Sequence, residues 1–252
     1  MLSFASIASG SNGNCYFVGD GTEAVLVDAG ISCRETERRM SRLGLSPASV
    51  KGIFVSHEHS DHISGVSVLA RKYQLPVFIN EATLYNSRLK LPDHLICLLH
   101  SHQPVAVGEL TVQPFAKSHD ASDPISFVIS KNDYHVGVFT DIGYACEEVT
   151  RFLHICHAVF LESNYCEKML AESHYPYFLK ARISGSKGHL SNEDAFNLLS
   201  NYTGNRLTHV VLSHLSGNNN HPDRVQTVFS PLLQRFKTHI ASRSEESPLF
   251  TL

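Results

Sequence analysis

Short apolar, β-branched runs recur along the chain between turn-forming residues, a pattern that predicts buried strands. CYFVG at 15–19 and AVLVDAG at 24–30 are separated by DGTE and predict a hairpin. Stretches in which charged and apolar residues follow helical spacing lie between later runs. The first third of the chain therefore predicts further strands at 50–56 and 76–80, and helices at 32–44, 61–75 and 81–89.

From about 95 to 140 the pattern changes to short strands joined by turns such as VGE and KND. The remainder returns to alternating strands and helices. The strands are predicted at 95–100, 103–107, 110–116, 125–130, 134–140, 158–163 and 208–214, and the helices at 191–202 and 221–236. The predicted elements form two similar halves, each with strands followed by helices. This arrangement predicts an α/β (α+β) fold with two mixed sheets covered by helices. No linker or repeat interrupts residues 1–252, so we expect a single domain.

Composition narrows the possible function classes. With 42% hydrophobic and 18% charged residues the chain can bury a large core, and its net charge of −3 excludes a globally basic nucleic-acid binder. Any nucleic acid must then be held by a local patch. The six cysteines include no CxxC pair, which favours reduced thiols over a cysteine metal or redox site. Neither a signal peptide nor a long apolar span is evident, so we expect a cytoplasmic protein without a membrane partner.

The sixteen histidines are the strongest chemical signal. Three of them fall in HEHSDH, directly after the strand predicted at 50–56, and other histidines and aspartates also follow predicted strands. Strand ends meet along one edge of a layered α/β fold, where sites are built. Imidazole and carboxylate together suit a pair of first-row divalent ions. The candidates are Asp28, His57, His59, Asp61, His62, His119, Asp141 and His214.

A chance cluster of histidines would leave the matching residues at the other strand ends unexplained. Asp28 taken alone is better suited to supporting the site than to binding an ion. Its carboxylate can accept hydrogen bonds from histidine N–H groups or from backbone amides.

The order of these residues resembles the five motifs of the metallo-β-lactamase-fold hydrolases. The resemblance implies a four-layer αβ/βα sandwich with the site at one edge of the two sheets. It also implies two divalent ions, with Zn or Mn favoured and Fe suited to the same ligands. In this scheme one ion is held by His57, His59 and His119, the other by Asp61, His62 and His214, and Asp141 lies between them with Asp28 in support.

Longer stretches point to one branch of that family. ASGSNGNCYFV, LESNY, GHLSNEDA and LSHLSGNNN resemble the YycJ/WalJ group, whose members are described as DNA exonucleases acting from the 5′ end. His59 stands where iron–flavin members carry glutamate, which disfavours a redox site. Tyr165 departs from the group, in which an acidic residue or histidine is common at that position.

The resemblance implies a dinuclear phosphodiesterase, most specifically a 5′→3′ DNA exonuclease, with a hydroxide shared by the two ions as nucleophile. Asp61 and Asp141 would be catalytic through the metals. His189 in GHLSN would protonate the leaving oxygen and Glu162 would orient it; the alternative is a surface histidine in a glycine-rich loop. A small-molecule hydrolase, either a cyclic phosphodiesterase or a thioester or lactone hydrolase, would use the same metals, and a non-catalytic metal-binding module is a third alternative.

Substrate contacts are suggested by three stretches, each with a plainer alternative. The loop SGSNGN can approach an anion through backbone N–H groups or be an ordinary turn. The basic residues near 180 can neutralise phosphates or form a solvated loop. YPYF at 175–178 can stack on a base, although core packing is favoured. The candidate contacts are Ser11, Asn12, Asn14, Asn164, Lys180, Arg182 and Lys187, with Lys117 and Lys168 nearby.

Overall fold

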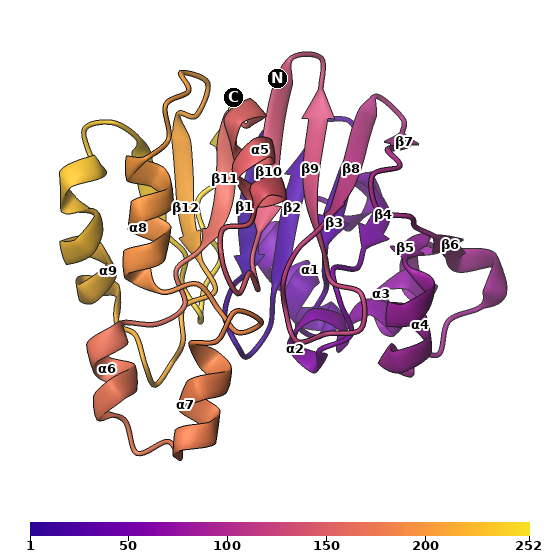
Figure 1. Cartoon of the computed structure of the whole chain (residues 1–252). Helices are drawn as coiled ribbons and strands as arrows, with labels where there is room; N and C mark the ends of the chain where they lie inside the picture. Colours follow the sequence, from indigo (N-terminus) through magenta and orange to yellow (C-terminus); the bar gives the residue numbers. More distant parts are fainter.

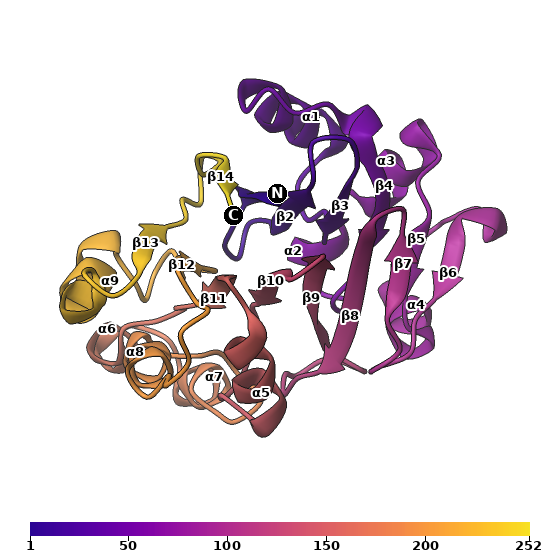
Figure 2. The same cartoon turned by 90° about the horizontal axis from the view of Figure 1, so that it is seen from above.

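Two seven-stranded mixed sheets stack face to face in the computed structural model, which describes all of residues 1–252 (Figures 1 and 2). The first sheet has the order β14-β1-β2-β3-β4-β5-β6 and the second β13-β12-β11-β10-β9-β8-β7. The first comprises β1 (Ser3–Ala8), β2 (Cys15–Gly19), β3 (Ala24–Val27), β4 (Val50–Phe54), β5 (Val77–Ile79), β6 (Ile96–Leu98) and β14 (Phe250–Thr251).

The two sheets repeat one pairing scheme, in which three antiparallel pairings are followed by three parallel ones. Parallel neighbours bring their carboxyl ends to the same edge of a sheet. The candidate metal ligands come directly after several of these strand ends. The second sheet comprises β7 (Val105–Val107), β8 (Leu110–Ala116), β9 (Ile125–Lys131), β10 (Tyr134–Phe139), β11 (Ala158–Glu162), β12 (His209–Ser213) and β13 (Lys237–Ile240).

Helices cover the outer faces, so the predicted four-layer αβ/βα sandwich is confirmed (Figure 2). Strand β3 shows why its sequence is continuously apolar: Leu26 packs toward the helices, while Val25 and Val27 pack into the core between the sheets. The helices are α1 (Cys33–Arg42), α2 (Ser60–Ile63), α3 (Val66–Tyr73), α4 (Glu81–Ser87), α5 (Glu147–Ile155), α6 (Glu167–Glu172), α7 (Tyr177–Ile183), α8 (Asn192–Ser200) and α9 (Pro222–Phe229).

Two predicted helices are shorter than expected. The helix predicted at 61–75 breaks between α2 and α3, because the Gly65 N–H donates to the Ala29 carbonyl. That approach is close: a Cβ on Gly65 would lie 2.0 Å from the Ile31 oxygen. The helix predicted at 221–236 ends at Phe229 and continues only as a 3₁₀ turn, since Pro231 has no N–H to donate.

Other elements were missed by the pattern: β1, β13, β14, α5, α6 and α7. Helix α7 buries none of its residues, so it has no apolar stripe to detect. The expectation that YPYF packs in the core is wrong, because Tyr177 is 87% and Phe178 is 72% exposed. None of the helices combines the length and the apolar character needed to cross a bilayer.

Candidate metal centre

The carboxyl ends of strands from both sheets carry the histidines and acids identified in the sequence. Asp28 follows β3, His57 follows β4, and Asp141 and His214 follow β10 and β12. Asp28, Asp141 and His214 have φ angles of 60°, 54° and 59°, a region that non-glycine residues rarely adopt. Such a residue turns the chain sharply as it leaves the strand. Strain of this kind is concentrated at functional sites.

Three imidazoles converge in the first ligand set. His57 Nε2 lies 3.0 Å from His59 Nδ1, and His119 Nε2 lies 3.4 Å from the same atom. Ligands 2.0–2.1 Å from a tetrahedral ion lie roughly 3.4 Å from one another. The spacing of these three nitrogen atoms therefore fits a single shared cation.

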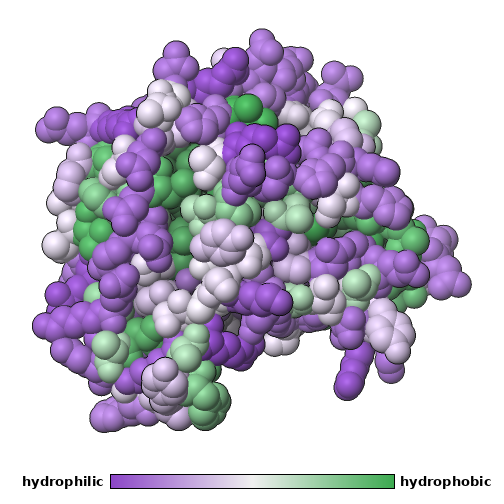
Figure 3. Space-filling model, in the orientation of Figure 1, coloured by the Kyte–Doolittle hydropathy of each residue, from purple (hydrophilic) through white to green (hydrophobic).

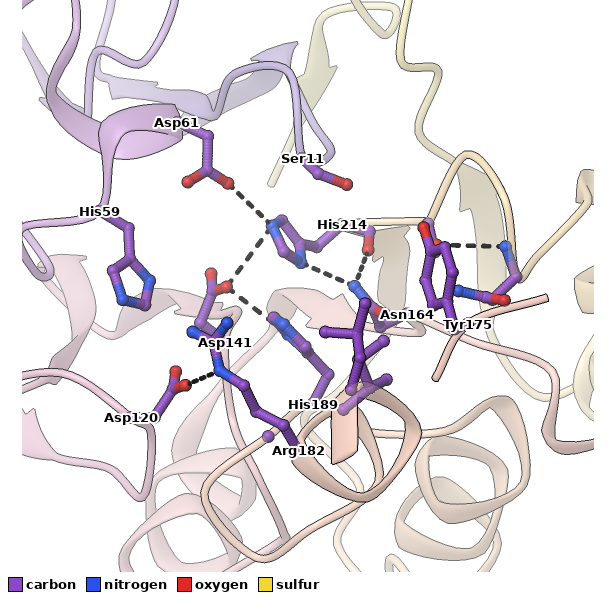
Figure 4. A pocket seen from close by; sticks show the side chains of 15 residues that line it. Ser11, His59, Asp61, Asp120, Asp141, Asn164, Tyr175, Arg182, His189 and His214 are labelled. Carbon is purple, nitrogen blue, oxygen red and sulfur yellow. Dashed lines mark hydrogen bonds and ion pairs between the residues drawn. The ribbon is translucent and has the colours of Figure 1, made fainter. Parts of the chain in front are cut away.

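A second set faces the first across one carboxylate. Asp61 Oδ2 lies 3.5 Å from both His62 Nε2 and His214 Nε2. Asp141 lies between the sets: its Oδ2 is 3.2 Å from His62 Nε2, and its Oδ1 is 3.4 Å from His214 Nε2 and 3.8 Å from His119 Nε2 (Figure 4). The structure thus brings together all seven predicted ligands. Four of them lie in the one segment that leads from β4 into α2, and His119, Asp141 and His214 follow β8, β10 and β12.

Buried acceptors fix which nitrogen of each histidine points inward. Asp28 is fully buried and accepts hydrogen bonds from the His62 Nδ1–H (2.7 Å), the Ser56 N–H (2.7 Å) and the Ser56 hydroxyl (2.8 Å). Because the Ser56 hydroxyl donates to Asp28, it accepts from His57 Nδ1 at 2.9 Å. His62 and His57 therefore present the lone pairs of their Nε2 atoms to the site.

A backbone carbonyl fixes which ring nitrogen of His119 points into the site. The Gly188 oxygen accepts from His119 Nδ1 at 2.9 Å. Only glycine fits at this position, since an added Cβ would lie 2.1 Å from the Ile183 oxygen. The loop that carries His189 therefore also orients a member of the first ligand set.

The charges at the site favour bound cations. Burial lowers the pKa of His57 well below its usual value and that of His119 to about 4, so both stay neutral, as a metal ligand must. In the second set burial is outweighed by the carboxylates, above all Asp141, which raise the pKa of His62 and bring that of His214 to about 10. Burial also opposes ionisation of Asp141, but the charges of His214 and His62 lower its pKa. The carboxylates thus attract positive charge to the second set.

Unpaired buried atoms complete the case that these residues fit metal ions. Asp141 Oδ2 and His214 Nε2 are buried and have no hydrogen-bond partner. A buried polar atom without a partner costs free energy, and a cation between these two atoms would remove that cost. The donor set, mostly imidazole with carboxylate, suits Zn, Mn or Fe.

A carboxylate–histidine pair lies beside the ligands. Glu162 is fully buried at the end of β11, and its Oε1 accepts from His189 Nδ1 at 2.8 Å and from His214 Nδ1 at 3.1 Å. Its Oε2 accepts from the backbone of Ile142 and Leu190. Burial raises its pKa, but the charge and hydrogen bond of His189 lower it to about 2, so Glu162 remains ionised. His189 is therefore held with its Nε2 directed away from Glu162.

Comparison with known proteins gives the same picture for the whole chain. The profile of the metallo-beta-lactamase superfamily matches residues 8–150. The chain is 36% identical over 241 residues to exodeoxyribonuclease YycJ of Bacillus anthracis, covering 92% of this chain and 89% of that one. The chain belongs to the metallo-β-lactamase superfamily. It is therefore a metal-dependent hydrolase whose His and Asp clusters suit metal binding.

Other members of the superfamily are similar to this chain in sequence or in fold. Exodeoxyribonuclease WalJ of Streptococcus pneumoniae is 32% identical over 222 residues, which cover 86% of this chain and 82% of that one. The crystal structure of YhfI, a metallo-β-lactamase-fold protein of Bacillus subtilis, superimposes with a TM-score of 0.75 at 16% identity, covering 98% and 99% of the two chains. At that identity the likeness concerns the fold alone.

A cavity of about 270 Å³ lies next to the two ligand sets (Figure 4). Three of the predicted substrate contacts line it: Ser11, Asn164 and Arg182. Asn164 also fixes the loop after β12, because its Nδ2 donates to the His214 carbonyl at 2.8 Å. Arg182 pairs with Asp120, another lining residue.

The other predicted contacts lie outside this cavity. Asn14 is buried and its Nδ2 lies 3.2 Å from Asp61 Oδ2, so it touches a ligand of the second set. Asn12 donates to the Arg243 carbonyl and Lys180 to the Ala171 carbonyl, while Lys187 is exposed at the surface. The suggested phosphate contact by Lys117 is wrong: this residue is buried and donates to the Thr140 carbonyl. Lys168 pairs with Glu172, at 3.9 Å.

Sequence reasoning missed Ser56 and Asp120, while Tyr175, which belongs to the YPYF stretch considered for base stacking, lines the cavity. Ser56 connects Asp28 to His57, and its place immediately before the first histidine of HEHSDH was the available signal. Asp120 also lines the cavity, but it belongs to a loop without a pattern. Its position depends on how that loop folds over the strand ends.

Proposed function

We propose that this chain is a dinuclear metal-dependent phosphodiesterase, and specifically a DNA exonuclease that digests in the 5′→3′ direction. The observation that carries the proposal is the pair of ligand sets sharing Asp141, with the His189–Glu162 pair beside them. Two relatives named as exodeoxyribonucleases align along most of this chain, which supports DNA as the substrate.

Each side chain around the metals has a distinct task. His57, His59 and His119 would hold one ion, Asp61, His62 and His214 the other, and Asp141 would contribute to both. When bound, two such ions supply Lewis-acid activation of a water nucleophile and neutralise charge on phosphoryl oxygens. Asp28 and Asn14 position the second set through His62 and Asp61.

His189 is suited to proton donation. Hydrolysis of a phosphodiester releases an alkoxide, which must be protonated as the bond to phosphorus breaks. The buried carboxylate of Glu162 binds His189 Nδ1 at 2.8 Å and fixes the orientation of the imidazole. That His189 also lines the cavity supports a role in which its Nε2–H would donate to the leaving oxygen.

The lining of the cavity suits a polar, anionic substrate. Only three of its fifteen residues are hydrophobic. Ser11 and Asn164 offer hydrogen bonds to nonbridging oxygens, and Arg182 can exchange its bond to Asp120 for a phosphate. Lys180 lies with Arg182 on α7, and Lys187 lies in the loop that follows α7, where a longer strand would pass.

A digestion assay tests this proposal directly. The protein is reconstituted with Zn, Mn or Fe and given single- and double-stranded DNA and RNA, labelled at either the 5′ or the 3′ end. A 5′→3′ exonuclease releases the 5′ label as a mononucleotide at the earliest times and shortens 3′-labelled strands progressively. Hydrolysis of cyclic nucleotides, thioesters or lactones without any cutting of DNA would instead establish a small-molecule hydrolase.

A further inference from the structure

A second hollow lies beside the metal-binding loop, away from the cavity described above. It is lined by residues of α2, α3 and the segment that follows α4. In Figure 1, α2 lies between α7 on one side and α4 on the other, so the two hollows flank the ligands that α2 carries. Its lining residues are Glu58, Ser60, Ile63, Ser64, Ser67, Arg71, Ser87, Arg88, Leu89 and Lys90.

The charge of this hollow is unusual for a chain with a net charge of −3. Arg71, Arg88 and Lys90 are exposed, and none of them has a carboxylate within ion-pair distance. By contrast, Arg182 in the first cavity is paired with Asp120. Unpaired cations gathered in a concave surface create a positive potential that attracts anions.

The polar groups around these cations are partly free. The hydroxyls of Ser60 and Ser67 make no hydrogen bond within the protein, whereas those of Ser64 and Ser87 donate to helix carbonyls. Glu58 is the one carboxylate in the lining, and its Oε1 accepts from the backbone and hydroxyl of Ser122. Arg71 Nη1 donates to the Lys90 carbonyl at 3.2 Å, which ties the two walls together.

Resting on the proposed nuclease function, we infer that this hollow binds the phosphodiester backbone of the DNA strand on the far side of the scissile bond from α7. Glu58 and Ser60 flank the ligand His59 in sequence, so the hollow adjoins the first ligand set. A strand that enters past Arg182 and crosses the metals reaches Arg88 and Lys90 next. The basic patch that a net acidic nuclease requires therefore lies on α3 and on the segment that follows α4, as well as near residue 180.

A charge-removal pair tests the inference. Arg88→Gln and Lys90→Gln are combined in one variant, and Lys51→Gln with Lys237→Gln serves as the matched control. The control lysines are also exposed and free of ion pairs, but they lie at the amino ends of β4 and β13, opposite the metals. Binding of fluorescent DNA is followed by anisotropy over a range of salt, using a phosphorothioate strand that resists hydrolysis. Turnover of bis-p-nitrophenyl phosphate is measured in parallel.

Loss of two phosphate contacts should weaken binding of a long strand about tenfold and reduce the slope of log Kd against log salt by about 1.5. Turnover of bis-p-nitrophenyl phosphate should not change, because that substrate is too small to extend from the metals into the hollow. If the variant matches the control while the native protein digests DNA, the inference is wrong and the nuclease proposal stands. If the native protein neither binds nor cuts DNA, both are wrong. Inhibition by inorganic phosphate as effective as by DNA would show a single-anion site and overturn the inference.

Discussion

Replacing His189 with alanine separates proton donation from metal binding. His189 Nδ1 binds Glu162 at 2.8 Å and lies 3.7 Å from Asp141 Oδ1, and the side chain is 23% exposed toward the cavity. Since it belongs to neither ligand set, its removal should leave the metal content unchanged. The protein should also fold normally, because the imidazole lies at the rim of the site.

The magnitude follows from the role assigned to the imidazole. General acid catalysis contributes about 10²- to 10⁴-fold to a rate, which corresponds to roughly 3 to 5 kcal/mol in the barrier. That loss should appear in kcat on DNA, whose leaving alkoxide needs a proton. It should be below about tenfold on bis-p-nitrophenyl phosphate, whose stable phenolate leaves without one.

The assay therefore compares the two substrates for one variant. His102→Ala, which removes an exposed histidine that belongs to neither ligand set nor the cavity lining, is the control and should match the native protein on both substrates. Metal content is measured by elemental analysis on each sample. An equal fall in kcat on both substrates, or a fall that follows lost metal, would refute the role of His189 as an acid.

Four further predictions concern the metals and the fold. Asp141→Asn should lower metal content and reduce turnover at least 100-fold, and treatment of the native protein with a chelator should lower its melting temperature. Asp28→Asn should weaken metal affinity about 10- to 100-fold in a competition titration and cost roughly 2 kcal/mol in denaturant unfolding, because three buried donors lose a charged acceptor. Hydrogen bonds from Arg38 and Arg39 lower the pKa of Glu35 from 4.5 to about 2, so this carboxylate stabilises the fold above pH 4.5 and that contribution is lost as the pH falls toward 2. Glu35→Gln should therefore cost about 1 kcal/mol at neutral pH and almost nothing near pH 2, as measured by urea unfolding at each pH.

The sequence predicted the features that strand and histidine patterns express directly. Strand β4 followed by His57 and His59 is a local signal, and the apolar runs located most strands of both sheets. Hydrogen bonds between loops that are distant in sequence were not predictable. The hydrogen bond between His119 and the Gly188 carbonyl joins loops 69 residues apart.

The sequence also could not show which basic residues lack an ion-pair partner in the folded protein. The basic residues near 180 stood out as a cluster, yet in the structure Arg182 is paired and Lys180 is bound to a carbonyl. Arg71, Arg88 and Lys90 are spread over twenty positions and form a patch only because α3 packs near the segment after α4. The electrostatic potential at a surface can be inferred from the charged residues of a sequence only when the ion pairs between them are known.

Backbone strain links the fold to the chemistry of the site. Asp28, Asp141 and His214 each follow a strand and adopt a left-handed conformation, which costs of order 1–3 kcal/mol per residue. Glycine would relieve that strain but would remove the carboxylate or imidazole. Surrounding hydrogen bonds hold two of these turns: the Asp28 N–H donates to the Phe54 carbonyl, and the His214 N–H donates to the Ser9 hydroxyl. Because the same turn ends strands in both sheets, side chains from two halves of the chain meet at one edge. It follows that the ligand geometry depends on the ends of strands in both sheets.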